Sequence, residues 1–323
     1  MGLFRQVRTM QIPEDKRSLW NRVSVLLLVY DASVATGVGA PLVIADESIE
    51  QEPRAEQNTF AESALAYSST EIDYMVTSAL LGQILRNILR VLYSARAEPT
   101  DSDLIFISSE LEFYDKKVPH VPESATQDTS SMTRHELILA PLLRLKFLYA
   151  SLFYHRQLVL KCDDRTKRSS HQHLLSSTVN EICNVMSYLN SHALCPFCPG
   201  WVTTAVFHTI TILFNRLNEP VAVSLCPVVV DAKALVEILM ESLAEMEGTW
   251  NFAAWIHKVS RVTLTAIEQK AQERRSDHNV TSMFSNDFPL SIEENMPLDD
   301  NFIALSGWDS LFPLSWDPSG GWI

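Results

Sequence analysis

Residues 14–53, EDKRSLWNRVSVLLLVYDASVATGVGAPLVIADESIEQEP, decide how the chain folds. Apolar residues recur at helical spacing along the first part of this stretch and predict a long helix with one broad buried face. That face comprises Leu19, Trp20, Val23, Leu26, Leu27, Tyr30 and Val34. The helix is expected to end at residues 37–41, because glycine can turn the chain and proline disfavours helix in the residue before it. A short apolar piece, residues 42–44, then leads to an acidic segment that closes at Pro53.

The order of residues in this unit resembles a signature of the regulatory (middle homology) domain of fungal zinc-cluster transcription factors. In that domain a basic residue and a Trp open a helix, an Asp follows, and a Gly-Arg-Pro turn leads to Ile-x-Asp and an acidic segment with a Pro. The matching residues here are Arg17, Trp20, Asp31, Gly39, Pro41, Ile44, Asp46 and Pro53. Two positions depart from the signature: Asn21 replaces the second Trp of the usual pair, and Ala40 replaces the Arg of Gly-Arg-Pro. A buried ion pair made by that arginine would be lost here.

The resemblance covers about residues 14–275 and implies an all-α fold of antiparallel helices. It also implies a transcriptional regulator in a fungal nucleus, not an enzyme, which controls nutrient use or a secondary-metabolite gene cluster. The zinc cluster that binds DNA in this family belongs to an N-terminal module that this sequence lacks. Zinc is therefore expected only in that module, and DNA contact only through it. The expected partners are coactivator or transcription-machinery proteins and a second copy of the chain, with no membrane.

Composition agrees with this class. Of 323 residues, 46 % are hydrophobic, which is enough for a large core, and only 9 are glycine, which favours helices joined by plain loops. The net charge of −13 would repel a phosphate backbone, so the chain itself is a poor candidate for DNA contact. Five cysteines, an odd number, fit a reducing compartment. No apolar run is expected to be long enough to span a bilayer.

Further helices are expected from apolar periodicity and capping residues. Their ranges are residues 58–66, 71–95 (capped by Ser69 or Thr70), 101–117 (capped by Thr100 or Asp101), 142–160, 171–191, 200–217, 228–246 and 250–275. A capping box at Thr133 and Glu136 opens the fourth of these, and Pro141 is expected to start it late or to kink it. Residues 162–169 are expected to form a charged linker.

The composition changes after Arg275, which divides the chain into a helical domain, residues 1–275, and a largely irregular acidic tail, residues 276–323. The tail has no Lys or Arg, and its acidic residues alternate with aromatic ones. Charge repulsion would keep these aromatics solvated and free to enter a coactivator groove. The candidates for such an activation segment are Phe302, Trp308, Phe312 and Trp316. Docking of the tail on the helical body is the alternative, and the two are compatible.

Few residues qualify for a chemical site. Cys195, Cys198 and His192 have the only metal-like spacing, and two buried thiols in a prolyl turn are the simpler interpretation. His155 is interpreted as a packed histidine, and Arg17 as a structural partner of Asp31. No catalytic motif occurs. Two other classes stay open: a partner-binding scaffold or repressor without its own DNA binding, and a helical enzyme or small-molecule binder, for which the sequence has no marker.

Overall fold

A computed structural model describes residues 14–39, 42–44, 68–93, 98–121, 133–218 and 232–284. Within these ranges the protein is all-α, as the sequence predicts, and no residue is in a strand. The elements are α2 (Glu14–Val38), α4 (Ser69–Leu92), α5 (Asp101–Lys117), α6 (Arg134–Lys161), α7 (Arg165–Ser191), η3 (Cys195–Phe197), α8 (Trp201–Asn218), α9 (Ala232–Met246) and α10 (Asn251–Phe284). The helix expected at residues 58–66 lies outside the described ranges.

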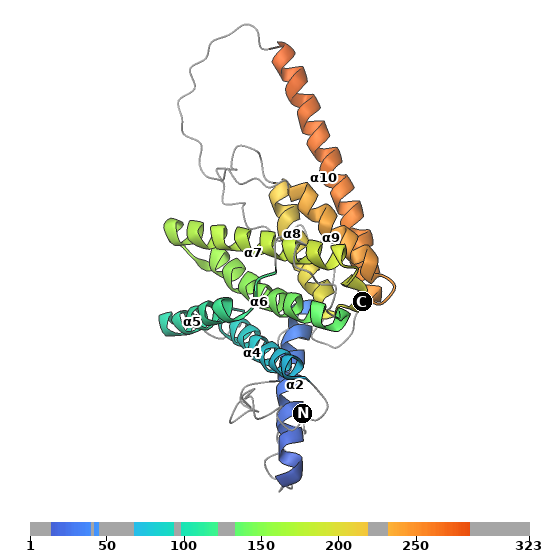
Figure 1. Ribbon diagram of the computed structural model, residues 1–323. Helices are drawn as coiled ribbons and strands as arrows, with labels where there is room; N and C mark the ends of the chain where they lie inside the picture. The colour runs from blue at the N-terminus through green and yellow to red at the C-terminus, as the bar shows by residue number, and fades with distance from the viewer. Residues whose placement is uncertain are drawn as a thin grey trace, which may run out of the picture. The chain divides into compact units, whose positions relative to one another are not determined.

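Helix α6 is the centre of the core. Every residue from 144 to 154 is buried, on all sides of the helix, which is typical of a helix surrounded by others. Its most extensive contacts are with α7 and α4, and Figure 1 shows it between these two helices. Pro141 lies inside α6 and does not delay its start, which is at Arg134. The side chain of Glu136, half of the expected capping box, lies outside the description.

The α6–α7 connection is shorter than the sequence analysis predicts. Helix α7 begins at Arg165, so the predicted linker at residues 162–169 is wrong beyond residue 164. The side chain of Asp164 accepts hydrogen bonds from the backbone amides of Thr166 and Lys167, at 2.8 and 3.3 Å. This N-cap starts a helix whose first turns are polar because they are exposed to solvent. The short connection makes α6 and α7 an antiparallel hairpin.

Capping boxes start two further helices. Ser68 caps α4 and pairs reciprocally with Glu71, so the predicted caps Ser69 and Thr70 are wrong by one or two residues. Thr100 caps α5 in the same way with Asp103. Each box satisfies amide groups that the first helical turn leaves without partners. The helices therefore begin where these serine and threonine hydroxyls lie.

The C-terminal helix runs past the predicted domain boundary. Helix α10 continues to Phe284, nine residues beyond Arg275. The chain divides into two units, Met1–Lys270 and Ala271–Ile323, so α10 belongs to both. The four aromatic residues proposed for activation, Phe302, Trp308, Phe312 and Trp316, lie outside the described residues.

Helix α2 buries a different face from the one the sequence analysis predicts. The buried apolar residues are Val25, Leu28, Val29, Ala32 and Ala35. The predicted face is instead exposed at Leu19, Val23, Leu26, Leu27, Tyr30 and Val34. The buried face, which includes Ala32 and Ala35, packs against α4 and α8, the two neighbours of α2 in Figure 1.

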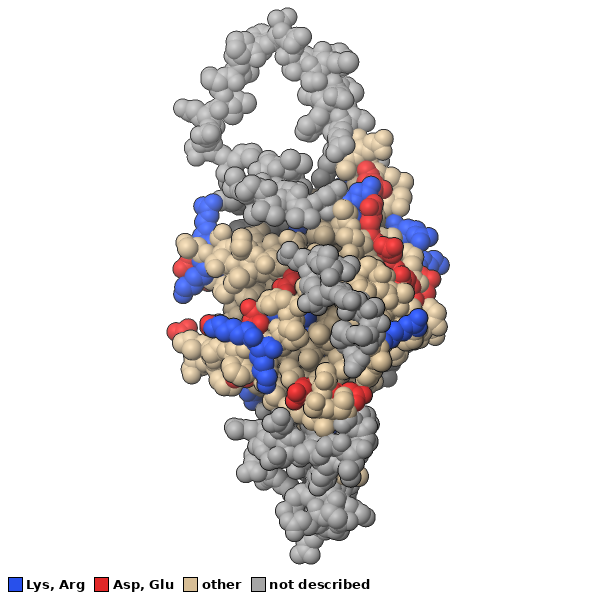
Figure 2. Space-filling model, viewed as in Figure 1, with Lys and Arg blue, Asp and Glu red and all other residues tan. Residues whose placement is uncertain are grey.

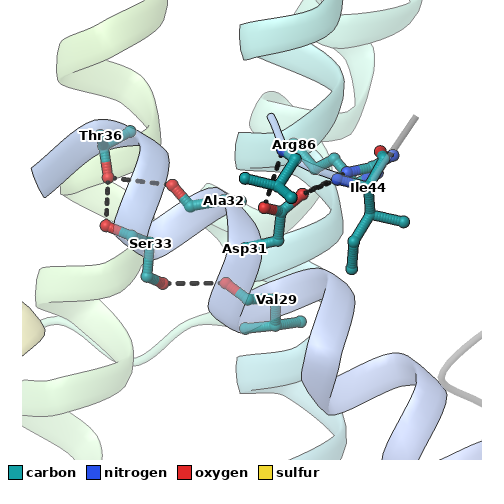
Figure 3. Close-up of polar contacts among 8 residues, drawn as sticks. Val29, Asp31, Ala32, Ser33, Thr36, Ile44 and Arg86 are labelled. Atoms are coloured by element: carbon teal, nitrogen blue, oxygen red, sulfur yellow. Dashed lines mark hydrogen bonds and ion pairs between the residues drawn. The ribbon is translucent and has the colours of Figure 1, made fainter. Parts of the chain in front are cut away.

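Two hydroxyl groups on α2 are accommodated near the core by their own helix. Ser33 donates to the carbonyl of Val29 at 2.9 Å, and Thr36 donates to the carbonyl of Ala32 at 3.1 Å (Figure 3). Such bonds satisfy a buried hydroxyl without a partner from another helix. Helix α2 can therefore enter the core with these polar residues on it.

His208 joins α8 to the end of α2. Its Nε2 lies 3.0 Å from the carbonyl of Thr36, and its ring meets Phe153 edge-on with centroids 4.9 Å apart. Burial lowers the pKa of His208 to about 4 against a smaller opposing effect of the Thr36 hydrogen bond. Burial, with a smaller contribution from His171, also lowers the pKa of His155 to about 4. Both side chains are thus neutral in the folded protein near pH 7.

We expect acid to destabilise the protein through these histidines. The unfolded chain binds a proton at each of them below its unperturbed pKa of about 6.5, while the folded protein does not until about pH 4. Stability should fall as pH drops through this window, by about 1–2 kcal/mol per histidine between pH 7 and 5. His208→Gln keeps a hydrogen-bond donor and should reduce this loss in urea unfolding. His173→Gln, at an exposed position, is the control, and an equal effect of both substitutions would contradict the account.

Candidate functional site

A buried carboxylate on α2 holds the chain that follows the helix. Asp31 is 8 % exposed. Its Oδ1 accepts a hydrogen bond from the amide of Val43 at 3.0 Å, and its Oδ2 accepts one from the amide of Ile44 at 3.1 Å. The chain can come back to Asp31 because Gly39 has a φ of +65°, a conformation that a glycine adopts without strain. Figure 3 shows Asp31 directed at Ile44.

An arginine from α4 completes this arrangement. Arg86 Nη1 donates to Asp31 Oδ2 at 3.2 Å, and its Nη2 donates to the carbonyl of Ile44 at 2.7 Å. The amide of Ile44 therefore bonds to Asp31 while its carbonyl bonds to Arg86. We call Asp31, Arg86, Val43 and Ile44 the latch. The latch ties three separate parts of the chain together: α2, α4 and residues 42–44.

A glycine one turn before Arg86 lets the two helices approach. A Cβ atom at Gly82 would lie 2.5 Å from Cγ1 of Val29, closer than real contacts allow. Gly82 and Arg86 are four residues apart and so lie on the same face of α4. Arg86 is thus brought to Asp31, two residues after Val29 on α2, by the close contact at Gly82.

The latch is a structural arrangement whose charged groups are directed at each other. Arg86 is 1 % exposed, so its charge is withdrawn from water almost completely. Removing one partner from such a buried pair leaves the other charge uncompensated, which costs about 3–5 kcal/mol. The Asp31 carboxylate and the Arg86 guanidinium bond to each other and to backbone groups of Val43 and Ile44. The latch can therefore fix residues 42–44 in place.

The structure brings together two of the eight signature residues, Asp31 and Ile44. Gly39 forms the turn between them. Arg17 and Trp20 lie in α2, but their side chains are outside the described part of the structure, as are Pro41, Asp46 and Pro53 entirely.

The predicted partner of Asp31 is wrong, because the guanidinium at Asp31 belongs to Arg86. Arg17 precedes Asp31 by 14 residues in the same helix, or about 21 Å along its axis, which is beyond the reach of an arginine side chain. The sequence analysis missed Arg86. The available signal is its place among Ile84, Leu85 and Ile88, where an arginine must be buried with a counter-charge.

A second buried arginine links α5, α6 and α7. Arg144 on α6 donates through Nε to Glu181 at 2.5 Å and through Nη1 to Asp115 at 2.8 Å. His120 Nδ1 lies 3.3 Å from the same Glu181 carboxylate. Two carboxylates thus face one buried guanidinium. Like the latch, the ion pairs of Arg144 join separate helices, because Asp115 lies on α5 and Glu181 lies on α7.

Lys146 is a third buried cation. Its Nζ donates to Ser78 Oγ at 2.8 Å and lies 5.8 Å from the ring centre of Trp201. Burial lowers its pKa to about 8. The sequence analysis did not single out this lysine, although it lies among buried apolar residues of α6.

The structure does not assemble the predicted metal candidates into a site. Cys195 Sγ donates to Asn190 Oδ1 at 2.8 Å, while His192 Nδ1 lies 2.9 Å from the carbonyl of Tyr188. The hydrogen bond with Cys198, together with burial, raises the pKa of the Cys195 thiol. Among the described residues there is no group of three or more His, Cys, Asp or Glu side chains that could hold a metal. Cys195 lies in the short helix η3 beside Pro196, and Cys198 caps the end of that helix. Both cysteines are buried, as the prolyl-turn interpretation expects.

His155 packs between the two arms of the α6–α7 hairpin. Its Nδ1 lies 3.4 Å from Nδ1 of His171, and its ring meets Tyr154 edge-on. Of two nitrogens that close, one carries the proton and the other accepts it. This is the environment expected for a packed histidine.

Charged residues of both signs lie on the surface of the described chain. On the face in Figure 2, Lys and Arg side chains are interspersed with Asp and Glu, without a large patch of one sign.

Two helices of the described chain, Ser69–Leu92 and Leu137–Lys161, are long and apolar enough to cross a bilayer, so the expectation that no segment reaches this length is wrong. Most of each apolar window is buried inside the protein, 56 % and 78 % respectively, which accounts for its composition by helix packing.

Breaking the latch should be strongly destabilising. We expect Arg86→Met to lower the free energy of unfolding by about 3–5 kcal/mol, because Asp31 stays buried without its cation. The double variant Asp31→Asn/Arg86→Met should lose at least about 1 kcal/mol less than the sum of the two single variants. Urea unfolding measures all three. Lys116→Ala, which removes an exposed pair with Glu112, should cost less than about 1 kcal/mol, and additive losses at Asp31 and Arg86 would contradict the direct pair.

Gly82→Ala tests the close approach of α2 and α4. The added methyl must displace Val29, so we expect a loss of about 1–3 kcal/mol although alanine favours helix. Gly248→Ala is the matched control, since a Cβ there meets no atom within 4 Å. Thermal or urea unfolding gives both values. If the two substitutions had the same effect, the helices would not touch at Gly82.

Comparisons with known proteins leave the family of this chain unassigned. No family model, no curated protein and no solved structure matches it. The likeness to the fungal zinc-cluster regulatory domain therefore stands on the signature residues themselves.

Proposed function

We propose that this chain is the regulatory part of a fungal zinc-cluster transcription regulator, with a helical body that holds or senses and an acidic tail that recruits. In this proposal the body comprises residues 1–275 and the tail residues 276–323. DNA binding belongs to a zinc module outside this sequence. The chain acts in the nucleus through coactivator or transcription-machinery proteins and catalyses no reaction.

One observation carries the proposal: the latch joins residues of the signature in space. Asp31 and Ile44 are 13 positions apart in sequence, and the amide of Ile44 bonds to the carboxylate of Asp31. A chance match of isolated residues has no reason to meet in this way. Arg86 supplies a guanidinium to Asp31 and to the carbonyl of Ile44, both of them signature residues.

The composition of the tail supports the recruiting role. From residue 276 onward the chain has eight acidic residues and no Lys or Arg. Its aromatic residues include Phe302, Trp308 and Phe312, at spacings of six and four. An acidic, aromatic segment of this kind can dock its rings in a hydrophobic groove of a partner.

Reporter activation tests the proposal. We would fuse the full chain to a neutral DNA-binding module and measure transcription from a matching promoter in a fungal host. The fusion should activate, and replacing Phe302, Trp308, Phe312 and Trp316 by alanine should reduce activation at least about tenfold, because hot-spot aromatics carry most of such binding energy. Protein levels are compared by immunoblot.

A matched control replaces four polar residues of the same tail, Asn301, Ser306, Ser310 and Ser315, by alanine, which should leave activation unchanged. An inactive fusion at normal protein level would favour the alternative, a scaffold or repressor without activating ability. Equal losses in the two quadruple variants would contradict a role for the aromatic side chains.

A further inference from the structure

Two histidines face each other across the α6–α7 hairpin. Nδ1 of His155 lies 3.4 Å from Nδ1 of His171, and the two rings are tilted by 32° with their centres 5.6 Å apart. Both side chains are half-buried, so an ion from the solvent can reach them. In the described part of the chain each Nδ1 has the other as its hydrogen-bond partner. Two imidazole nitrogens from different helices thus meet in one small space.

The lengths of the two helices place this pair at the same height. His155 is six residues before Lys161, the last residue of α6. His171 is six residues after Arg165, the first residue of α7. At 1.5 Å per residue, each histidine is about 9 Å from its end of the connection. Because the hairpin is antiparallel, both rings lie near the connected ends of α6 and α7, which meet in Figure 1.

A tyrosine and a helix cap hold the pair in place. The ring of Tyr154 meets the rings of His155 and His171 edge-on, with centroids 5.2 and 6.4 Å away. The Tyr154 hydroxyl donates to the carbonyl of Leu104 on α5 at 3.3 Å. The side chain of Asp164 caps α7 two turns before His171. A pair that is already ordered loses less conformational freedom when it binds an ion.

The separation of the two nitrogens matches that of two imidazole ligands on one zinc ion. Zn–N bonds are about 2.0–2.1 Å long and zinc is tetrahedral, so two nitrogens bound to it are about 3.3–3.4 Å apart. Zinc binds the neutral imidazole. Burial lowers the pKa of both histidines, with a smaller contribution from His171 to that of His155. Near pH 7 zinc therefore does not have to compete with an imidazolium proton.

Histidines elsewhere in the described chain face other kinds of group. His192 Nδ1 and His208 Nε2 each lie within 3.0 Å of a backbone carbonyl oxygen. The carboxylate beside His120 belongs to Glu181, which also accepts from the buried guanidinium of Arg144. The contact on the α6–α7 hairpin differs because both of its members are metal ligands by type and neither is bonded to a charged group there.

We propose that His155 and His171 bind one zinc ion through their Nδ1 atoms. The proton between the two nitrogens leaves to the solvent and Nε2 of the same ring takes one up, so both imidazoles stay neutral. Among the described residues no third His, Cys, Asp or Glu side chain joins the pair, so water molecules supply the other ligands. Zinc at this site is exchangeable and ties α6 to α7. This inference does not depend on the proposed role in transcription.

Calorimetric titration of the full, tag-free chain with ZnCl2 near pH 7 tests the proposal. We expect one zinc ion per chain, and His155→Gln and His171→Gln should each weaken binding at least about tenfold, because glutamine has no imidazole nitrogen. His173→Gln removes an exposed histidine two residues along α7, and Cys162→Ser removes a half-buried thiol at the connection. These matched controls should bind zinc as the original chain does. MgCl2, whose ion prefers oxygen ligands, should not bind at this pair.

Two further measurements cover a variant that does not fold. In urea unfolding, excess zinc should lower the unfolding equilibrium constant of the original chain at least about tenfold, because the paired ligands exist only in the folded state. The same zinc should leave His171→Gln nearly unchanged. NMR of the histidine ring nitrogens needs no variant: zinc should shift the Nδ1 signals of His155 and His171 together.

No zinc binding up to about 1 mM would overturn the proposal. Binding that survives His171→Gln in a folded chain, or that His173→Gln weakens equally, would do the same. Zinc-dependent NMR shifts at other histidines, with the signals of His155 and His171 unmoved, would also contradict it.

Discussion

The buried ion pair between Asp31 and Arg86 is the interaction on which the N-terminal half of the fold depends. It joins α2 to α4 across 55 residues of sequence, and both partners also hold Ile44. Two charges this deep would be costly without each other, so the pair forces α4 to lie where Arg86 can reach Asp31. The close approach at Gly82 and the turn at Gly39 both serve this geometry. The chain after α2 is thereby fixed to the helix that precedes it.

Local signals predicted the helices well and their contacts poorly. The end of α2 and the start of α5 follow from a glycine turn and a threonine cap, which act within a few residues. The buried face of α2 could not be assigned because both sides of the helix are apolar. The larger side chains, such as Leu26 and Tyr30, made their side of α2 the predicted buried face. The close contact between Gly82 and Val29 instead requires a smaller side chain on the buried face. Arg86 was missed because its partner is distant in sequence, and no local pattern identifies such a pair.

The two sides of α2 have different tasks in this account. The inner side packs on α4 and α8 and carries Asp31, so it sets the internal order of the body. The outer side, which includes Leu26 and Tyr30, takes no part in that packing and is exposed. A helix that is apolar on both sides is costly to expose to water.

Amide hydrogen exchange at Val43 and Ile44, measured residue by residue by NMR, tests the latch most directly. Both amides donate to Asp31, and the Asp31–Arg86 pair that receives them is buried. The account predicts that both exchange at least about a hundredfold more slowly than in an unstructured peptide, and that Asp31→Ala abolishes this protection. Free exchange of both amides in the original chain, or protection unchanged by Asp31→Ala, would contradict the claim that this carboxylate holds the segment.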